Sequence, residues 1–165
     1  MLHDTVRAIL TRELYALRRG IEAYPDDASV WRPLPGVPNV GGTLVLHLCG
    51  NLQHYVGAVL GGTSYRRDRD AEFSRRDVPR AELLREIDAA IAAVARGLGA
   101  TTEAASGGIF PEKVGGREVM TSDMLVHIAA HLAYHLGQFD YHRRVVTGDG
   151  RGVGAMAISE LPAAR

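Results

Sequence analysis

The clearest sign of the fold is the stretch TSDMLVHIAAHLAYHLGQFDYHRRVV, residues 121–146. Thr121 or Ser122 is suited to cap the start of a helix, because a side-chain hydroxyl can accept a hydrogen bond from a free backbone N–H there. Asp123 follows in the expected first turn, where a carboxylate interacts favourably with the helix dipole. The stretch therefore predicts the longest helix of the chain, from residue 121 to about residue 146.

Three more helices are predicted upstream. Apolar residues recur at helical spacing in residues 2–24 and again in residues 81–98. The segment TLVLHLCGNLQHYVGAVL, residues 43–60, is mostly apolar and almost uncharged, as expected of a helix buried on most of its circumference. Four helices of this length predict an all-α protein with the architecture of a four-helix bundle.

Two long connections separate the first three helices. Residues 25–42 contain several prolines and glycines, which cannot sustain a helix or an interior strand. We expect this connection to be pinned by Trp31. Residues 63–78 mix charges of both signs, which is typical of a solvated surface loop with internal ion pairs.

A small hairpin is predicted just before the last helix. The stretch IFPEKVGGREVM, residues 109–120, alternates weakly about Gly115 and Gly116, a pair that suits a tight turn. After the last helix the chain is rich in glycine and predicts a loop or arm. The expected organisation is a bundle over residues 1–147 and a C-terminal tail over residues 148–165.

Composition excludes several kinds of partner. The chain has 165 residues, which suits one domain, and 19 basic residues balance 19 acidic ones. Without a net basic field we expect no nucleic acid and no anionic membrane as a partner. Cys49 is the single cysteine, so no internal disulfide is possible. With no apolar run long enough for a signal peptide or a membrane span, we predict a cytoplasmic protein.

The histidines carry the main chemical signal. Six of the seven lie in two predicted helices, at 47 and 54 and at 127, 131, 135 and 142. Residues four apart on a helix lie about 40° apart around the axis and about 6 Å apart along it, so neighbouring members of His127, His131 and His135 can reach one ion. His47 and His54 lie about 10 Å apart along one face. Only one of these two is therefore expected to be a ligand.

This pattern favours an open, reactive metal site. Three histidines leave coordination positions for water or substrate, whereas closed structural sites usually have four ligands rich in cysteine. A single histidine would more often be a core or surface residue, but the cluster outweighs that interpretation. The glutamate of an HExxH peptidase is missing, because Ile128 and Leu132 stand at its position. Few carboxylates lie in the predicted helix interiors, which disfavours di-iron chemistry.

Three motifs resemble the DinB-like superfamily: HLCGNLQHY at 47–55, RDRDAEF at 67–73 and HLAYHLGQFDYH at 131–142. The resemblance spans nearly the whole chain. It implies an up-down-down-up four-helix bundle, commonly a homodimer. It also implies a divalent ion, often nickel or zinc, bound by one histidine of the second helix and an HxxxH pair of the fourth.

Carried over to this chain, the implied ligands are His47, His131 and His135. The ending His135-Leu136-Gly137-Gln138 favours this pair over His127 with His131, and His54 and His127 remain alternates. Some relatives are thiol-dependent transferases or isomerases in which the metal activates a low-molecular-weight thiol. We therefore expect a metal-dependent enzyme of the thiol S-transferase type that acts on a small molecule.

Two other functions stay open at this stage. One is a non-catalytic dimeric bundle with a structural or adventitious metal, and the other is a metal-free bundle that binds a small molecule. Five residues near the ligands or in the charged loop are candidates for supporting the site or contacting the substrate or thiol. They are Gln138, Tyr55, Tyr134, Arg67 and Arg69.

Overall fold

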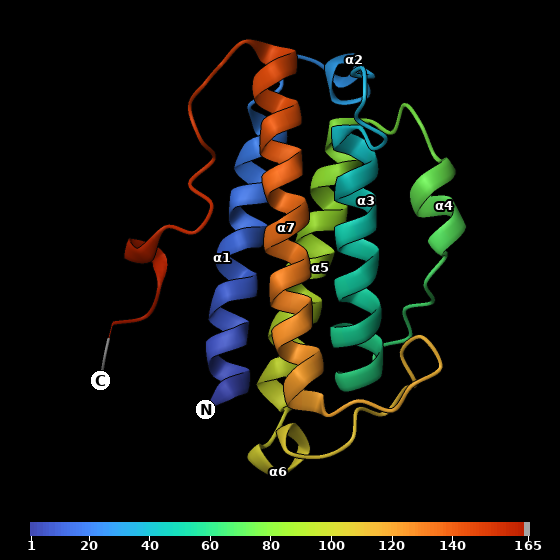
Figure 1. Cartoon of the computed structure of the whole chain (residues 1–165), viewed down its shortest axis with the longest axis vertical. Helices are drawn as coiled ribbons and strands as arrows, with labels where there is room; N and C mark the ends of the chain where they lie inside the picture. The colour runs from blue at the N-terminus through green and yellow to red at the C-terminus, as the bar shows by residue number, and fades with distance from the viewer. Residues whose placement is uncertain (164–165) are drawn as a thin grey trace.

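The computed structural model describes residues 1–163, and four long helical segments account for most of them. Figure 1 shows these segments side by side, with the first and last running in one direction and the two between them in the other. α1 packs against α5 and α7, and the second segment also packs against α5 and α7. The four segments are α1 (Leu2–Glu22), α3 (Gly41–Leu52) continued by η1 (Gln53–Leu60), α5 (Arg80–Ala100) and α7 (Thr121–Thr147).

The four predicted helices are thus present, and the all-α prediction is confirmed. Their centre is a continuous apolar core in which α1 contributes a row of side chains with no exposed surface: Leu10, Leu14, Leu17 and Ile21. Complete burial of one such side chain contributes about 1.5–3 kcal/mol to folding. The core therefore holds the long helices in a fixed register.

The second segment departs from a single regular helix. Every residue of α3 is buried, as its apolar sequence predicts, but from Gln53 to Leu60 the backbone forms a π-helix. η1 lies against α5. A Cβ at Gly97 would collide with the backbone of Val56, so this close approach depends on glycine.

The long connections contain helical turns that the sequence analysis did not expect. α2 (Asp27–Val30) forms within the proline-rich connection, and Asp26 caps it by accepting a hydrogen bond from the Ser29 N–H. α4 (Arg69–Ser74) forms within the charged segment. Asp26 and Asp68 each satisfy a free N–H of the first turn, which stabilises these short helices.

Trp31 pins the first connection, as predicted. Its indole N–H donates to the Val78 carbonyl at 3.0 Å, and its ring is buried. A Cβ at Gly42 would overlap that ring, so the start of α3 packs directly on the indole. The tryptophan thereby ties the connection before α3 to the residues just before α5.

The segment before α7 is a hairpin-like turn. It contains isolated bridges but no extended strand, and no strand occurs elsewhere in residues 1–163. Two isolated antiparallel bridges close it, Ile109 with Met120 and Val114 with Arg117. Gly115 and Gly116 both have positive φ, at 58° and 79°, which is the backbone of a type I′ turn. α6 (Glu103–Ser106) precedes this turn.

The predicted cap of α7 is wrong. The cap residue is Met120, which makes no side-chain capping bond, and Thr121 is already the first helical residue. The Thr121 N–H instead donates to the Gly108 carbonyl at 2.9 Å. Gly108, just before the turn at residues 109–120, therefore supplies a backbone acceptor at the helix end, where a side-chain hydroxyl was expected as the acceptor.

The tail from Gly148 to Ala163 lies beside α1 in Figure 1 and includes the short helix η2 (Ile158–Glu160). Arg19 donates to the Val153 carbonyl at 2.9 Å, and the Met156 N–H donates to the buried carboxylate of Glu13. Val153 is buried against the bundle. The tail is irregular, as expected, but it is held to the bundle by specific contacts.

No helix within residues 1–163 combines the length and the apolar character that crossing a membrane requires.

Candidate metal centre

Three histidines from two helices meet near the middle of the bundle. His47 comes from α3, while His131 and His135 come from successive turns of α7. The Nε2 atoms of His47 and His131 lie 3.2 Å apart, and one ring nitrogen from each of the three lies within 4.8 Å of the others. The imidazoles of His131 and His135 meet edge to face, with centroids 4.6 Å apart. This group can hold one metal ion.

Hydrogen bonds at the far side of two rings fix which nitrogen is available. Glu72 accepts from His47 Nδ1 at 3.0 Å, and since a carboxylate can only accept, the proton must be on Nδ1. Gln138 Oε1 accepts from His135 Nδ1 at 2.7 Å. In both rings Nε2 is left with its lone pair, which is the form that binds a metal.

The spacing between His47 and His131 fits two ligands of one metal ion. Bonds of about 2.0–2.1 Å from zinc to two imidazoles at the tetrahedral angle place the two nitrogens about 3.3 Å apart. The separation between His47 and His131 is 3.2 Å. The donor set, three imidazoles without cysteine, suits zinc or nickel and leaves coordination positions free.

The electrostatics keep two of the rings neutral. Burial, with smaller contributions from the neighbouring His135 and His47, lowers the pKa of His131 from 6.5 to about 4. Burial also lowers the pKa of His135, although the bond to Gln138 acts in the opposite direction. At neutral pH both imidazoles therefore have lone pairs available for coordination.

Glu72 is itself held in place by Arg67. The guanidinium makes two bonds to the carboxylate, Nε to Oε1 at 2.7 Å and Nη2 to Oε2 at 2.9 Å. Burial alone would raise the pKa of Glu72, but the bonds from His47 and Arg67 outweigh it, and the pKa is lowered. The carboxylate is therefore ionised at neutral pH.

The alternates His54 and His127 are not part of the three-histidine group. His54 Nε2 pairs with Glu112 at 3.1 Å instead. His127 is exposed, and its ring centroid lies 6.1 Å from that of His131. The equal spacing of His127, His131 and His135 along α7 made all three candidate ligands, but only His131 and His135 lie near His47 on α3.

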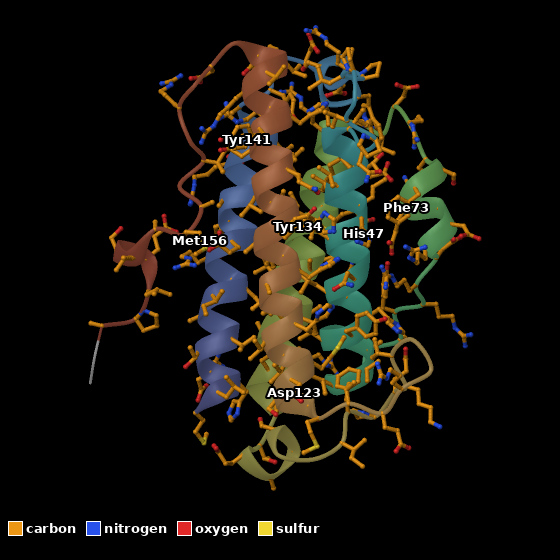
Figure 2. All side chains as sticks on the ribbon, in the orientation of Figure 1. His47, Phe73, Asp123, Tyr134, Tyr141 and Met156 are labelled. Carbon is orange, nitrogen blue, oxygen red and sulfur yellow. The ribbon has the colours of Figure 1, made fainter. Side chains whose placement is uncertain are left out.

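The supporting residues named from the sequence have mixed positions. Gln138 contacts His135, and Arg67 reaches the site only through Glu72, while also covering the ring of Tyr55 at 5.7 Å. Arg69 lies over the ring of Phe73 at 5.0 Å. Figure 2 places Tyr134 on α7, where its exposed ring lies 5.1 Å from that of His135.

A comparison with protein families identifies one family whose model matches most of the chain. The model of a family described as Mycothiol-S-transferase matches residues 5–148, which include the four long helical segments, apart from the first three residues of α1, and the three histidines. The chain belongs to the mycothiol S-transferase family. This family is DinB-like, so the resemblance noted in the motifs is confirmed. Searches of curated proteins and of solved structures gave no match.

For this member of the mycothiol S-transferase family, sequence reasoning missed Glu72 and Phe73 as neighbours of the histidines. Phe73 packs its ring 4.9 Å from that of His47, and Figure 2 shows the two residues on α4 and α3. The signal was the motif RDRDAEF, which was treated as a surface loop because its charges are mixed. Only the docking of α4 on α3 reveals that its glutamate is buried.

Proposed function

We propose that this protein is a metal-dependent thiol S-transferase that acts on a small molecule, with a divalent ion bound by His47, His131 and His135. The observation that carries the proposal is the convergence of three imidazole nitrogens, two of them on rings whose Nδ1 is already bonded to a protein acceptor. Family membership supports the same reaction class. Nickel or zinc is the ion that we expect.

The side chains of the site have separate roles. Each imidazole donates one lone pair from one ring nitrogen, and Glu72 and Gln138 hold the rings of His47 and His135 in that orientation. When bound, a divalent ion lowers the pKa of a thiol or water beside it, so that a nucleophile forms near neutral pH. His131 and His135 are half-buried, which leaves a side through which a small molecule can enter.

The thiol that we propose is mycothiol or a close analogue, on the strength of the family description. In the transfer, the thiol loses its proton to solvent, its sulfur forms a bond to an electrophilic carbon, and the leaving group departs with the bonding electrons. The electrophile is a small molecule. Tyr55, Tyr134 and Arg69 stay candidates for contacting it or the thiol.

Metal content per chain tests the site first. We expect close to one equivalent of metal in the native wild-type protein and a large loss in His47→Ala, His131→Ala and His135→Ala. The variants His54→Ala and His127→Ala are matched controls, because they remove histidines of the same helices that lie outside the group. A wild-type protein that binds no metal, even after reconstitution, would refute the proposal and favour a metal-free binding protein.

Activity is the second test. The metal-loaded protein should consume mycothiol and an electrophilic probe such as a halogenated aromatic compound, and the three ligand variants should not. A metal-loaded protein that binds its ion in the three-histidine group yet transfers no thiol to any probe would favour the non-catalytic bundle.

We extend the proposal to the topology, the domain bounds, the oligomeric state and the location of the protein. We assign the helix directions visible in Figure 1 to the up-down-down-up topology of the superfamily. We also propose a bundle domain over residues 1–147 with a tail over residues 148–165, a homodimer, and a cytoplasmic setting. Size-exclusion chromatography with light scattering tests the dimer.

A further inference from the structure

Glu72 occupies an unusual place beside the three histidines. Its side chain is 5% exposed, and it accepts a hydrogen bond from the ring nitrogen of His47 that faces away from His131 and His135. It therefore cannot reach an ion in the group without leaving this bond. We infer that Glu72, clamped by Arg67 and carried on α4, is a positioning residue that holds His47 as an Nε2 ligand and thereby sets metal affinity.

This inference rests on the proposed function, since it assumes that the three histidines bind a metal. Its basis is a further set of contacts, made to His47 by α4 and to Glu72 by Arg67 in the connection before α4. Glu72 thus adds a third element to the site.

The carboxylate has little freedom to turn. Arg67 bonds to both of its oxygens, and the Arg67 side chain is only 12% exposed. A two-point contact between guanidinium and carboxylate fixes orientation as well as distance. With both partners largely withdrawn from water, loss of either one leaves a poorly solvated charge, so the pair is expected to stay formed.

Glycine at position 50 allows this carboxylate to come so close to α3. Gly50 lies one turn after His47 on the same helix. A Cβ at this position would lie 2.8 Å from Glu72 Cδ and closer still to Oε1. Any side chain at residue 50 would therefore push the carboxylate away, and with it the acceptor of the His47 hydrogen bond.

Phe73, the next residue of α4, restrains the same imidazole from another direction. The centroid of its ring lies 4.9 Å from that of His47 at an interplanar angle of 44°. The Arg69 guanidinium lies over the Phe73 ring, 5.0 Å from its centroid. α4 therefore supplies both a hydrogen-bond acceptor and a packing surface for His47. The short helix in the charged connection has a role in the site rather than a purely solvated one.

The expected effect follows from how metal ligands are oriented. A carboxylate on the far nitrogen fixes the tautomer and the ring direction and increases the basicity of the ligating nitrogen. Loss of such a partner typically weakens metal binding about 10–100-fold. Glu72→Ala should therefore weaken binding by a factor in this range while the three histidines remain.

The experiment measures cobalt and zinc affinity in the full-length protein, by competition with a coloured chelator, together with the visible absorption spectrum of the cobalt form. The variants are Glu72→Ala, Glu72→Gln and Gly50→Ala. Glutamine keeps an acceptor for His47 but loses the charge, so its affinity should lie between those of wild type and Glu72→Ala. Gly50→Ala removes no polar group but displaces the Glu72 carboxylate, so it should weaken binding and change the cobalt spectrum.

Gly137→Ala is the matched control. This glycine lies on α7 between His135 and Gln138, and a Cβ there would meet nothing within 4 Å. It should leave affinity and spectrum unchanged. The comparison separates a glycine that admits the carboxylate from one that is merely close to a ligand in sequence.

The outcomes are distinct. Wild-type affinity and a wild-type cobalt spectrum in both Glu72→Ala and Gly50→Ala would overturn the inference, even if these variants unfold more easily, because a purely structural role would change stability alone. If either of them fails to fold, Glu72→Gln decides in the same way. A wild-type protein that binds no metal would instead be a failure of the proposed function.

Discussion

Two histidines on α7, His135 and His142, differ in how their ring nitrogens are used. His135 gives one nitrogen to Gln138 and keeps the other free within the three-histidine group. His142, two turns further on, uses both: Nδ1 lies 2.7 Å from the Tyr24 hydroxyl, and Nε2 lies 2.9 Å from the Arg32 carbonyl. Since the carbonyl only accepts, Nε2 carries the proton and Nδ1 accepts from Tyr24.

The difference separates a candidate ligand from a structural residue. His142 is 2% exposed and ties α7 to two points of the connection between α1 and α3, Tyr24 just after α1 and Arg32 further along. It has no lone pair left for an ion. The same amino acid on the same helix therefore has either role, and the partners at the second nitrogen decide which.

The largest effect should come from removing a ligand. His135→Ala should reduce zinc affinity by more than the roughly 10–100-fold that loss of a supporting partner costs, because a metal bond itself is lost. His142→Ala should retain wild-type affinity. Competition with a coloured chelator measures both, and equal losses in the two variants would remove the distinction between these histidines.

The reverse order is expected for stability. His142→Ala leaves the buried Tyr24 hydroxyl and the Arg32 carbonyl without their partner, at a cost of about 1–3 kcal/mol for each unsatisfied group. His135→Ala removes a half-buried ring and should cost less in the metal-free protein. Urea denaturation of both variants without metal gives the two free energies of unfolding, and a smaller loss in His142→Ala would contradict the structural role.

A pH series tests the burial of His131, the third histidine of the group on α3 and α7. Burial, with the neighbouring histidines, lowers its pKa in the folded protein from 6.5 to about 4. The unfolded chain therefore binds a proton first as pH falls, so the stability present above pH 6.5 is lost progressively between about pH 6.5 and pH 4. His131→Asn should lose less stability than wild type between neutral pH and about pH 5.

Urea denaturation of the metal-free proteins at the two pH values makes this measurement. Some loss should persist in His131→Asn, because burial also lowers the pKa of His142. An identical pH dependence in the two proteins would mean that His131 titrates normally in the folded state.

The smallest effect should come from Gly137→Ala, between the two histidines on α7. An alanine there meets open space, and it removes the conformational freedom of glycine in a helix interior. It should stabilise the protein by about 0.5–1 kcal/mol. Urea denaturation measures the gain, and a loss of stability would indicate that this part of α7 contacts something more than solvent.

The sequence predicted the helices well because their signals are local. The apolar spacing of residues 2–24 placed α1 within two residues at its C-terminal end, and the uninterrupted stretch from residue 121 predicted α7. Capping was predicted less well. α7 begins after Met120, which has no capping side chain. The Thr121 N–H is bonded to the Gly108 carbonyl of another segment, and no local sequence pattern predicts such a contact.

The candidate site was predicted only in part, for the same reason. Helical spacing put His127, His131 and His135 on one face of α7, but it could not say which pair lies toward α3. Which pair faces α3 depends on the position of α7 along its axis, and on its rotation about that axis, relative to α3. The burial of Glu72 was missed because its sequence neighbours are charged and mostly exposed.

The helical class, the approximate lengths of the main helices and the two helices that carry the histidines could be predicted from the sequence, since each follows from the periodicity of neighbouring residues. Tertiary structure alone decided that His47 meets His131, that Glu72 takes the far nitrogen of His47, and that His142 is used up by Tyr24 and Arg32. These pairs lie 25 to 118 residues apart along the chain, so only packing brings their atoms within hydrogen-bond distance.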